Sequence, residues 1–234
     1  MRIGVLTSGG DAPGMNAAVR AVVLQSARLG FETMAIYRGY DGLIDGEIKP
    51  IIPEEVKHLI GLGGTILKSA RSQKFMEPKG FNRAIQQMKK AKLDALVVIG
   101  GNGSLQGASR LASAGFQVVG IPGTIDNDIM GTDITIGFDT AVSVVVETVD
   151  RINDTANSVV TDQPRVFLIE VMGRNLGAIA VHVGLATGAN WTLIPEVPYD
   201  LDDVHREINE TKYSLIIVAE GAGGALSGRI LSQI

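Results

Sequence analysis

The sequence predicts an α/β protein in which parallel sheets are flanked by helices. Short apolar runs rich in β-branched residues alternate with longer amphipathic segments along the 234 residues. The runs are continuous rather than alternating, which is typical of strands buried on both faces of a parallel sheet. The 29 glycines form no linker, because they fall in short clusters after the apolar runs. We therefore expect strand ends that approach a ligand closely.

The predicted elements follow one another in a regular order. Strands are expected at 3–6, 31–37, 95–99, 118–121, 166–171, 191–194 and 215–219. Helices are expected at 17–29, 53–60, 79–91, 140–156, 177–187 and 201–208. Another helix is expected to follow the glycines at 100–103 and to run through Leu111, and the apolar residues of 226–234 suggest one more. Near Gly137 a loop-rich sequence gives way to a long helix, which divides the chain into 1–137 and 138–234.

The composition excludes several classes of function. Hydrophobic residues make up 45% and charged residues 20%, which is typical of a globular protein and not of a disordered one. The formal net charge of -4 argues against a nucleic-acid partner. With no cysteine, disulfides, thiolate nucleophiles and cysteine-ligated metals are excluded, and the three histidines have no ligand spacing. The first residues hold too short an apolar run for a signal peptide or a membrane span, so we expect a cytoplasmic protein with no membrane partner.

Two glycine-rich loops follow predicted strands. The first is TSGGDAPG at 7–14, and the second is GGNGS at 100–104. Glycines let a phosphate group reach backbone N–H groups, and the start of the next helix adds a favourable partial charge. The first loop is neither a Rossmann G-x-G-x-x-G nor a P-loop, since it lacks the Lys-Ser/Thr pair. A tight strand-to-helix turn is the alternative for each loop alone, but two such loops at one sheet edge favour a ligand.

A third loop, PGTIDND, carries two carboxylates, Asp126 and Asp128, on either side of a carboxamide. Like charges this close are unfavourable unless a cation, a donor or a substrate hydroxyl offsets them. The alternative is a turn in which these side chains cap their own backbone. Arg71, Arg165 and Arg174 could fork onto phosphate oxygens, although single arginines are more often solvated. Glycine loops, paired carboxylates and arginines together predict phosphoryl transfer.

Six motifs occur along the chain, namely LTSGGDAPGMNA, GGT-x-L-x-SAR, GG-x-GS, PGTIDNDI-x-GTD-x-TIGFDTA, VMGR and VAEG. Their order and spacing, from Met1 to about Gly221, resemble the bacterial ATP-dependent 6-phosphofructokinase family. The resemblance implies two Rossmann-like domains, of which 1–137 would bind ATP and 138–234 would bind a sugar phosphate. It also implies a glycolytic transferase that moves a phosphoryl group from ATP to fructose 6-phosphate, with Mg²⁺ as cofactor.

The resemblance also implies roles for individual residues. The ATP site would be lined by Gly10, Tyr40, Arg71, Ser72, Asn102, Gly103, Ser104 and Gly107. Asp126 would be the base for the 1-hydroxyl, and Thr124, Arg71 and Arg174 would complete the catalytic group. Fructose 6-phosphate would contact Thr124, Ile125, Asp126, Met172, Gly173, Arg174 and Glu220, together with Arg165 from a neighbouring subunit of a homotetramer. Asn102 and Asp128 would hold Mg²⁺.

The chain departs from the family pattern at two points. Asn102 replaces the aspartate of the family's GGDGS loop, and no GH-x-QRGG segment follows VAEG, so the second domain is expected to be incomplete. Family members that use pyrophosphate tend to carry Asp and Lys where Gly103 and Gly123 stand, which favours ATP. The alternative function is a catalytically weak or silent relative that binds nucleotide or sugar phosphate. A Rossmann oxidoreductase lacks its glycine fingerprint here.

Overall fold

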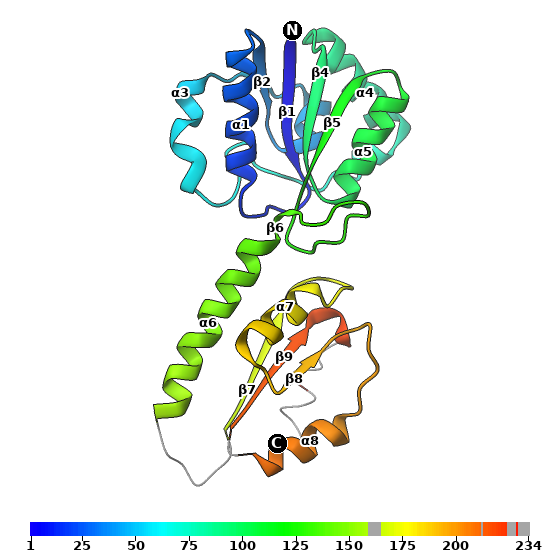
Figure 1. Ribbon diagram of the computed structural model, residues 1–234. Helices are drawn as coiled ribbons and strands as arrows, with labels where there is room; N and C mark the ends of the chain where they lie inside the picture. The colour runs from blue at the N-terminus through cyan, green and yellow to red at the C-terminus, as the bar shows by residue number, and fades with distance from the viewer. Residues whose placement is uncertain (159–164, 212, 224–227, 229–234) are drawn as a thin grey trace. The chain divides into compact units, whose positions relative to one another are not determined.

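The protein divides into two compact units, Met1–Gly137 and Phe138–Ile234, which are described separately. The computed structural model, shown in Figure 1, describes residues 1–158, 165–211, 213–223 and 228. Apart from Gly228, the helix expected over 226–234 lies outside the described residues.

The first unit is built on a six-stranded sheet with the order β3-β2-β1-β4-β5-β6. Its strands are β1 (Arg2–Ser8), β2 (Glu32–Ile36), β3 (Ile48–Pro50), β4 (Ala95–Gly100), β5 (Gln117–Thr124) and β6 (Ile136–Gly137). All neighbouring strands are parallel except β2 and β3, which are antiparallel. The expectation of an entirely parallel sheet is therefore corrected at one edge. Strand β3 ends in Pro50, a residue that suits an edge because it cannot donate to a further strand.

Five α-helices cover this sheet: α1 (Met15–Arg28), α2 (Gly39–Asp45), α3 (Pro53–Val56), α4 (Pro78–Lys90) and α5 (Asn102–Ser113). The helix expected at 53–60 is α-helical only as far as Val56 and continues as a 3-10 helix over Lys57–Gly61. Helix α2 was not expected, because glycines disfavour helices and it contains Gly39 and Gly42.

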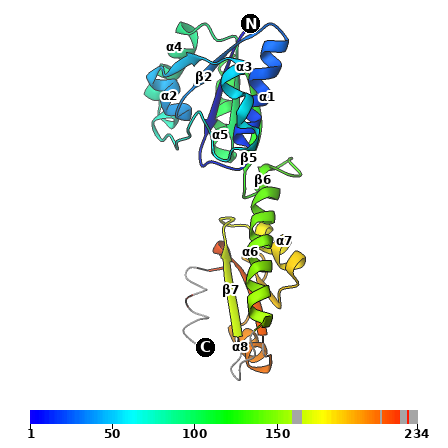
Figure 2. The same cartoon turned by 90° about the vertical axis from the view of Figure 1, so that its left-hand side faces the viewer.

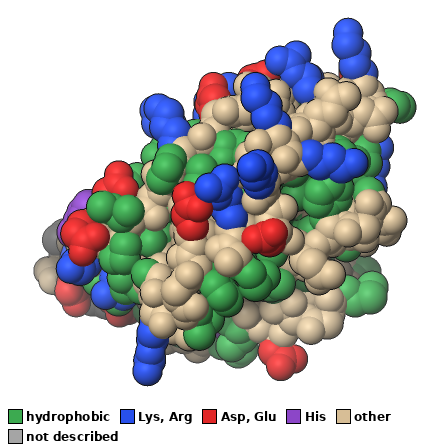
Figure 3. Space-filling view, turned by 90° about the horizontal axis from the view of Figure 1, so that it is seen from above, with side chains coloured by type: hydrophobic (Ala, Val, Ile, Leu, Met, Phe, Trp, Pro, Cys, Tyr) green, Lys and Arg blue, Asp and Glu red, His purple; other side chains and the backbone are tan. Residues whose placement is uncertain are grey.

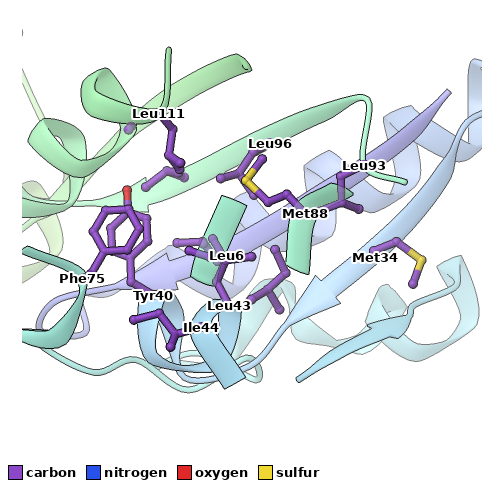
Figure 4. Packing of buried hydrophobic residues seen from close by; sticks show 14 residues of the cluster. Leu6, Met34, Tyr40, Leu43, Ile44, Phe75, Met88, Leu93, Leu96 and Leu111 are labelled. Carbon is purple, nitrogen blue, oxygen red and sulfur yellow. The ribbon is translucent and has the colours of Figure 1, made fainter. Parts of the chain in front are cut away.

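Side chains alternate along each strand of this sheet and fill one cluster on each face. Leu6 of β1 packs with residues of α2, α4 and α5, whereas its neighbour Val5 packs with residues of α1 and α3. Figure 2 shows α2 and α4 on the face opposite α1 and α3. Figure 4 shows the first cluster, in which the rings of Tyr40 and Phe75 stack 4.0 Å apart, centroid to centroid. Both faces of β1 and β4 are largely buried, as the continuous apolar runs predict, whereas β5 is more open, with Val119 60% exposed.

The carboxyl ends of β1, β4 and β5 lie side by side, because their register pairs Ser8 with Gly100 and Gly100 with Pro122. Helix α1, which follows β1, and helix α5, which follows β4, cover opposite faces of the sheet. The strand order therefore reverses between β1 and β4. Such a switch point is where open α/β sheets bind ligands.

The second unit has a parallel three-stranded sheet with the order β7-β9-β8. Its elements are α6 (Phe138–Ser158), β7 (Arg165–Val171), α7 (Ala178–Thr187), β8 (Trp191–Leu193), α8 (Leu201–Glu210) and β9 (Tyr213–Ala219). The central strand β9 is buried from Ser214 to Ala219, and α7 packs against α6, where the Phe138 and His182 rings meet edge to face. Within the part of the chain that the structure describes, no helix is both long and apolar enough to cross a membrane.

Candidate active site

The two glycine loops at the switch point pack against each other. A Cβ atom at Gly100 would lie 2.4 Å from the Ser8 carbonyl oxygen and 2.7 Å from Ser104 Oγ. Gly9 has a φ of +92°, which favours glycine, and a Cβ atom there would lie 3.3 Å from Ser104 Oγ. Gly10 is exposed and has open space where its side chain would be. The two loops therefore come close to each other because glycines occupy the contact, and at Gly10 the backbone of the first loop is open to a ligand.

Helix α5 begins at this edge with its first turn accessible. Gly101 precedes it without a side-chain cap, and the first turn carries no acidic residue. Asn102 and Gly103 are exposed, and no atom lies within 4 Å of the position that a Gly103 Cβ would take. The first N–H groups of a helix have no intrahelical partner and carry the positive end of the helix dipole. The start of α5 therefore suits a phosphate group.

The carboxylate loop after β5 is held in a fixed conformation by its own polar side chains. Asp126 is 6% exposed, and its N–H group donates to Thr124 Oγ1 (3.2 Å). Asn127 has a φ of 52°, and its carboxamide donates to the Asp133 carbonyl (3.1 Å) and accepts from the Thr135 N–H group (2.9 Å). The buried hydroxyl of Thr135 donates to the Thr124 carbonyl (2.7 Å). This network places Asp126 at the end of β5 beside the glycine loops.

The two residues expected to hold a metal are neighbours. Asn102 Nδ2 donates to the Asp128 carbonyl oxygen (3.1 Å) and links α5 to the carboxylate loop. Among the described residues no three His, Asp or Glu side chains form a metal-binding group. One carboxylate and one amide oxygen do not make a closed cage, but Mg²⁺ usually takes only one or two protein ligands and completes its shell with phosphate oxygens and water. The donor set therefore fits Mg²⁺ that arrives with a nucleotide.

The segment with Arg71 and Ser72 runs between β3 and α4. Ser72 Oγ donates to Asp41 Oδ1 (2.5 Å) and accepts from the Phe75 N–H group (3.2 Å). The Arg71 side chain is exposed, so its guanidinium group can reach a ligand. The preceding backbone is tied to the first glycine loop, because the Gly9 N–H group donates to the Ala70 carbonyl (3.2 Å).

Tyr40 and Gly107 pack against each other behind the first turn of α5. The Tyr40 side chain is 3% exposed, and its hydroxyl donates to the Ser104 carbonyl of α5 (2.7 Å). A Cβ atom at Gly107 would lie 2.8 Å from the Tyr40 ring, so α5 can approach the ring only with glycine there. Burial raises the pKa of Tyr40 well above its usual value, so the hydroxyl keeps its proton and remains a donor. The Tyr40 side chain therefore packs against the buried face of α5 and offers little surface to a ligand.

In the second unit the structure brings together four of the five expected residues. Met172, Gly173 and Arg174 form the turn after β7, and the Arg174 N–H group donates to Glu220 Oε1 (2.8 Å). Arg174 has a φ of 54° and an exposed side chain. Arg165 is the first residue of β7, at the opposite end of this strand, and it donates to the Ala156 carbonyl of α6 (3.3 Å).

Each unit therefore gathers its own set of predicted residues. The first unit brings the expected base and metal residues and most of the expected nucleotide residues to one sheet edge, together with Thr124 and Ile125, which are also expected to contact the sugar phosphate. The second unit holds the other residues expected for the sugar phosphate, with Arg165 at the far end of β7 from the rest. Several side chains that shape these loops were not among the predicted site residues: Thr7, Asn16, Asp41, Asn127 and Thr135. Asn127 and Thr135 lie inside the PGTIDND-containing motif, so the motif itself was the signal for them.

Comparison with known proteins identifies the family. A family model described as phosphofructokinase matches residues 2–234. The chain belongs to the phosphofructokinase family. The predicted family and the predicted α/β class are thereby confirmed.

Two curated relatives are named ATP-dependent 6-phosphofructokinase, the activity that the motifs predict. The protein from Bacillus cytotoxicus is 51% identical over 230 residues, which cover 96% of this chain and 71% of the relative. The protein from Halalkalibacterium halodurans is 49% identical over 99% of this chain and 73% of the relative. A solved structure of Pichia pastoris phosphofructokinase in the T-state matches with a TM-score of 0.89 and 36% identity, over 99% of this chain and 28% of the other.

Proposed function

We propose that this protein transfers the γ-phosphoryl group of ATP to the 1-hydroxyl of fructose 6-phosphate, giving fructose 1,6-bisphosphate and ADP in glycolysis. One observation carries the proposal most directly. The register of β1, β4 and β5 places two open glycine loops and the Asp126 loop side by side at the switch point of the sheet. The activity is also the one that the names of the bacterial relatives state.

Asp126 acts in this proposal as the general base. Its carboxylate takes the proton of the 1-hydroxyl while that oxygen forms a bond to the γ-phosphorus, and the bond from this phosphorus to the β-phosphate oxygen of ATP breaks. Two hydrogen bonds fix the position of this carboxylate: the Asp126 N–H group donates to Thr124 Oγ1, and the Thr135 hydroxyl donates to the Thr124 carbonyl. Phosphoryl transfer depends mainly on positioning and on charge neutralisation, which a rigid loop favours.

The donor phosphates would lie on Gly10 and on the first turn of α5 at Gly103 and Ser104. Neither Gly10 nor Gly103 has atoms within 4 Å of its missing Cβ, so phosphate oxygens can approach the backbone there. The exposed Arg71 would reach the transferring group and offset its charge. ATP is the proposed donor because glycine occupies positions 103 and 123.

Asn102 and Asp128 would hold Mg²⁺ together with oxygens of the nucleotide. Bound there, the ion would neutralise charge on the phosphates. The protein's own contribution is to hold the Asn102 side chain against the backbone of Asp128, through the bond from Asn102 Nδ2 to the Asp128 carbonyl oxygen (3.1 Å).

The second unit would bind the sugar phosphate through the turn at Met172–Arg174. Glu220 accepts from the Arg174 N–H group, and this bond fixes the turn with the Arg174 side chain exposed. The guanidinium group can then form two parallel hydrogen bonds to a phosphate. Arg165 would serve the 6-phosphate of a neighbouring subunit, which requires a homo-oligomer, by resemblance a tetramer.

The proposed partners are small molecules in the cytoplasm, and nucleic acid is not among them. On the face drawn in Figure 3, Lys and Arg side chains are interspersed with acidic and apolar ones. A nucleic-acid backbone would instead require a basic stripe or patch.

Asn102 favours a second candidate function, in which the protein binds the same ligands but has weak or no catalytic activity. The carboxamide brings no charge to the metal, and its nitrogen is engaged by the Asp128 carbonyl.

A coupled assay with ATP, fructose 6-phosphate and Mg²⁺ separates the two functions. We expect turnover with ATP and little with pyrophosphate. Asp126→Asn should lower kcat by about 10²–10⁴-fold while leaving ATP binding intact. Asp133→Asn is the matched control, because Asp133 is an exposed carboxylate of the same loop. ATP binding without turnover would establish the silent relative, and equal kcat in both variants would remove Asp126 from the mechanism.

A further inference from the structure

The backbone from Leu62 to Ala70 leads directly into Arg71, and a buried amide of α1 holds its first part. Asn16 is 4% exposed. Its Nδ2 donates to the carbonyl oxygens of Leu62 (3.1 Å) and Gly63 (2.9 Å), and its Oδ1 accepts from the Ile66 N–H group (2.7 Å). One side chain thus binds three backbone groups of a segment that lies 46 to 50 residues away in the sequence.

A buried hydroxyl of β1 holds the second part of the same segment. Thr7 is fully buried, and its Oγ1 donates to the Lys68 carbonyl (3.0 Å). Its Oγ1 also lies 2.9 Å from Thr65 Oγ1, so with the Thr7 proton used on Lys68 the Thr65 hydroxyl is the donor of this pair. Lys68 has a φ of 56°, a conformation that needs support from its surroundings.

We propose that Thr7 and Asn16 are positioning residues that hold Arg71 in place for phosphoryl transfer; the proposal rests on the function proposed above. Buried polar groups destabilise a fold unless they are hydrogen-bonded, and apolar side chains would fill both positions more simply. These two side chains instead fix the backbone of residues 62–68, a segment that contains the flexible pair Gly63 and Gly64. A displacement of about 1 Å in a group that contacts the transferring phosphoryl can cost about 10²-fold in rate.

The test uses variants that separate the hydroxyl from the packing. Thr7→Val keeps the shape and removes the hydroxyl, Thr7→Ser keeps the hydroxyl, and Asn16→Leu removes all three bonds of the amide. Val23→Ala is the control, because Val23 is a buried apolar residue further along α1 than Asn16, and its truncation weakens the unit through packing alone. Hydrogen exchange over 62–70 is measured for each, together with kcat and KM for ATP and fructose 6-phosphate.

We expect Thr7→Val and Asn16→Leu to lose exchange protection over 62–70 and to lower kcat by roughly 10- to 100-fold, with little change in either KM. Thr7→Ser should restore most of both properties, and Val23→Ala should change neither. Similar behaviour of Thr7→Val and Thr7→Ser, or an equal effect of Val23→Ala, overturns the proposal. So does lost protection with an unchanged kcat. If the unmodified protein shows no turnover, the proposed function fails, and exchange over 62–70 alone decides whether Thr7 and Asn16 hold the segment.

Discussion

Replacing Tyr40 by phenylalanine should lower the free energy of unfolding by an amount that follows from the one hydrogen bond of its buried hydroxyl. Tyr40→Phe removes the hydrogen bond to the Ser104 carbonyl (2.7 Å) and little else, because the side chain is 3% exposed and its ring stays stacked on Phe75. Ser104 O keeps the N–H group of the next helical turn as a donor. We therefore expect the net value of one hydrogen bond, a loss of about 0.5–1.5 kcal/mol in the free energy of unfolding at pH 7.

The same variant should change how stability depends on pH. Burial raises the pKa of Tyr40 in the folded state, whereas an unfolded tyrosine ionises near a pKa of about 10. Between these values the folded protein binds more protons than the unfolded chain, so its stability falls as the pH rises, by up to about 1.4 kcal/mol per pH unit. The phenylalanine variant lacks this loss. The advantage of the unmodified protein should therefore vanish between about pH 10 and pH 11 and reverse above it.

The assay is urea unfolding followed by circular dichroism from pH 7 to pH 11.5, because the only tryptophan, Trp191, lies in the second unit and does not report on Tyr40. Other groups titrate in both proteins and cancel in the difference. Tyr37→Phe, which alters a half-buried tyrosine of the same unit, is the matched control. A stability difference that stays constant over this range would refute the reasoning. ATP affinity should be unchanged, since the hydroxyl faces Ser104.

Two predictions concern the metal and the assembly. Asn102→Asp should tighten the dependence of kcat on Mg²⁺ and raise kcat, because a carboxylate adds charge beside Asp128; equal values in Mg²⁺ titrations of both proteins would show that the amide suffices. Inactive Arg165→Ala and inactive Asp126→Asn subunits should regain activity when mixed and reassembled. No recovery in oligomers shown by mass to be mixed would mean that each active site is built within one chain.

The sequence was sufficient for the parts of the fold that depend on local pattern. Continuous apolar runs rich in β-branched residues located seven of the nine strands described here. The other two, β3 and β6, have three and two residues, too few for any periodicity. Helix α2 begins at Gly39, and both Gly39 and the preceding Arg38 have left-handed φ values. Its stability comes from Tyr40, Leu43 and Ile44 in the core, which helix propensity cannot show.

The candidate site also has one part that local sequence pattern predicts and another part that depends on contacts between distant residues. The glycine loops and the Asp126 loop directly follow predicted strands, so a parallel sheet was enough to bring them to one edge. The bonds of Thr7 to Thr65 and of Asn16 to Gly63 join residues 58 and 47 positions apart, and no local pattern indicates them. The burial of Tyr40 likewise depends on Phe75 and Gly107, which come from two other segments.

One backbone feature is shared by the carboxylate loop of the first unit and the VMGR turn of the second. Asn127 and Arg174 both have positive φ values, of 52° and 54°, a conformation that costs about 1–3 kcal/mol for residues other than glycine, although asparagine tolerates it better. Each is braced by polar bonds: Asn127 by Asp133 and Thr135, and Arg174 by Glu220. Glycine would adopt this backbone without strain, but it would provide neither the carboxamide that fixes the Asp126 loop nor the guanidinium group proposed for the sugar phosphate. At these two positions the backbone strain therefore accompanies a side chain, at the end of a strand, for which glycine offers no substitute and to which the proposed function gives a role.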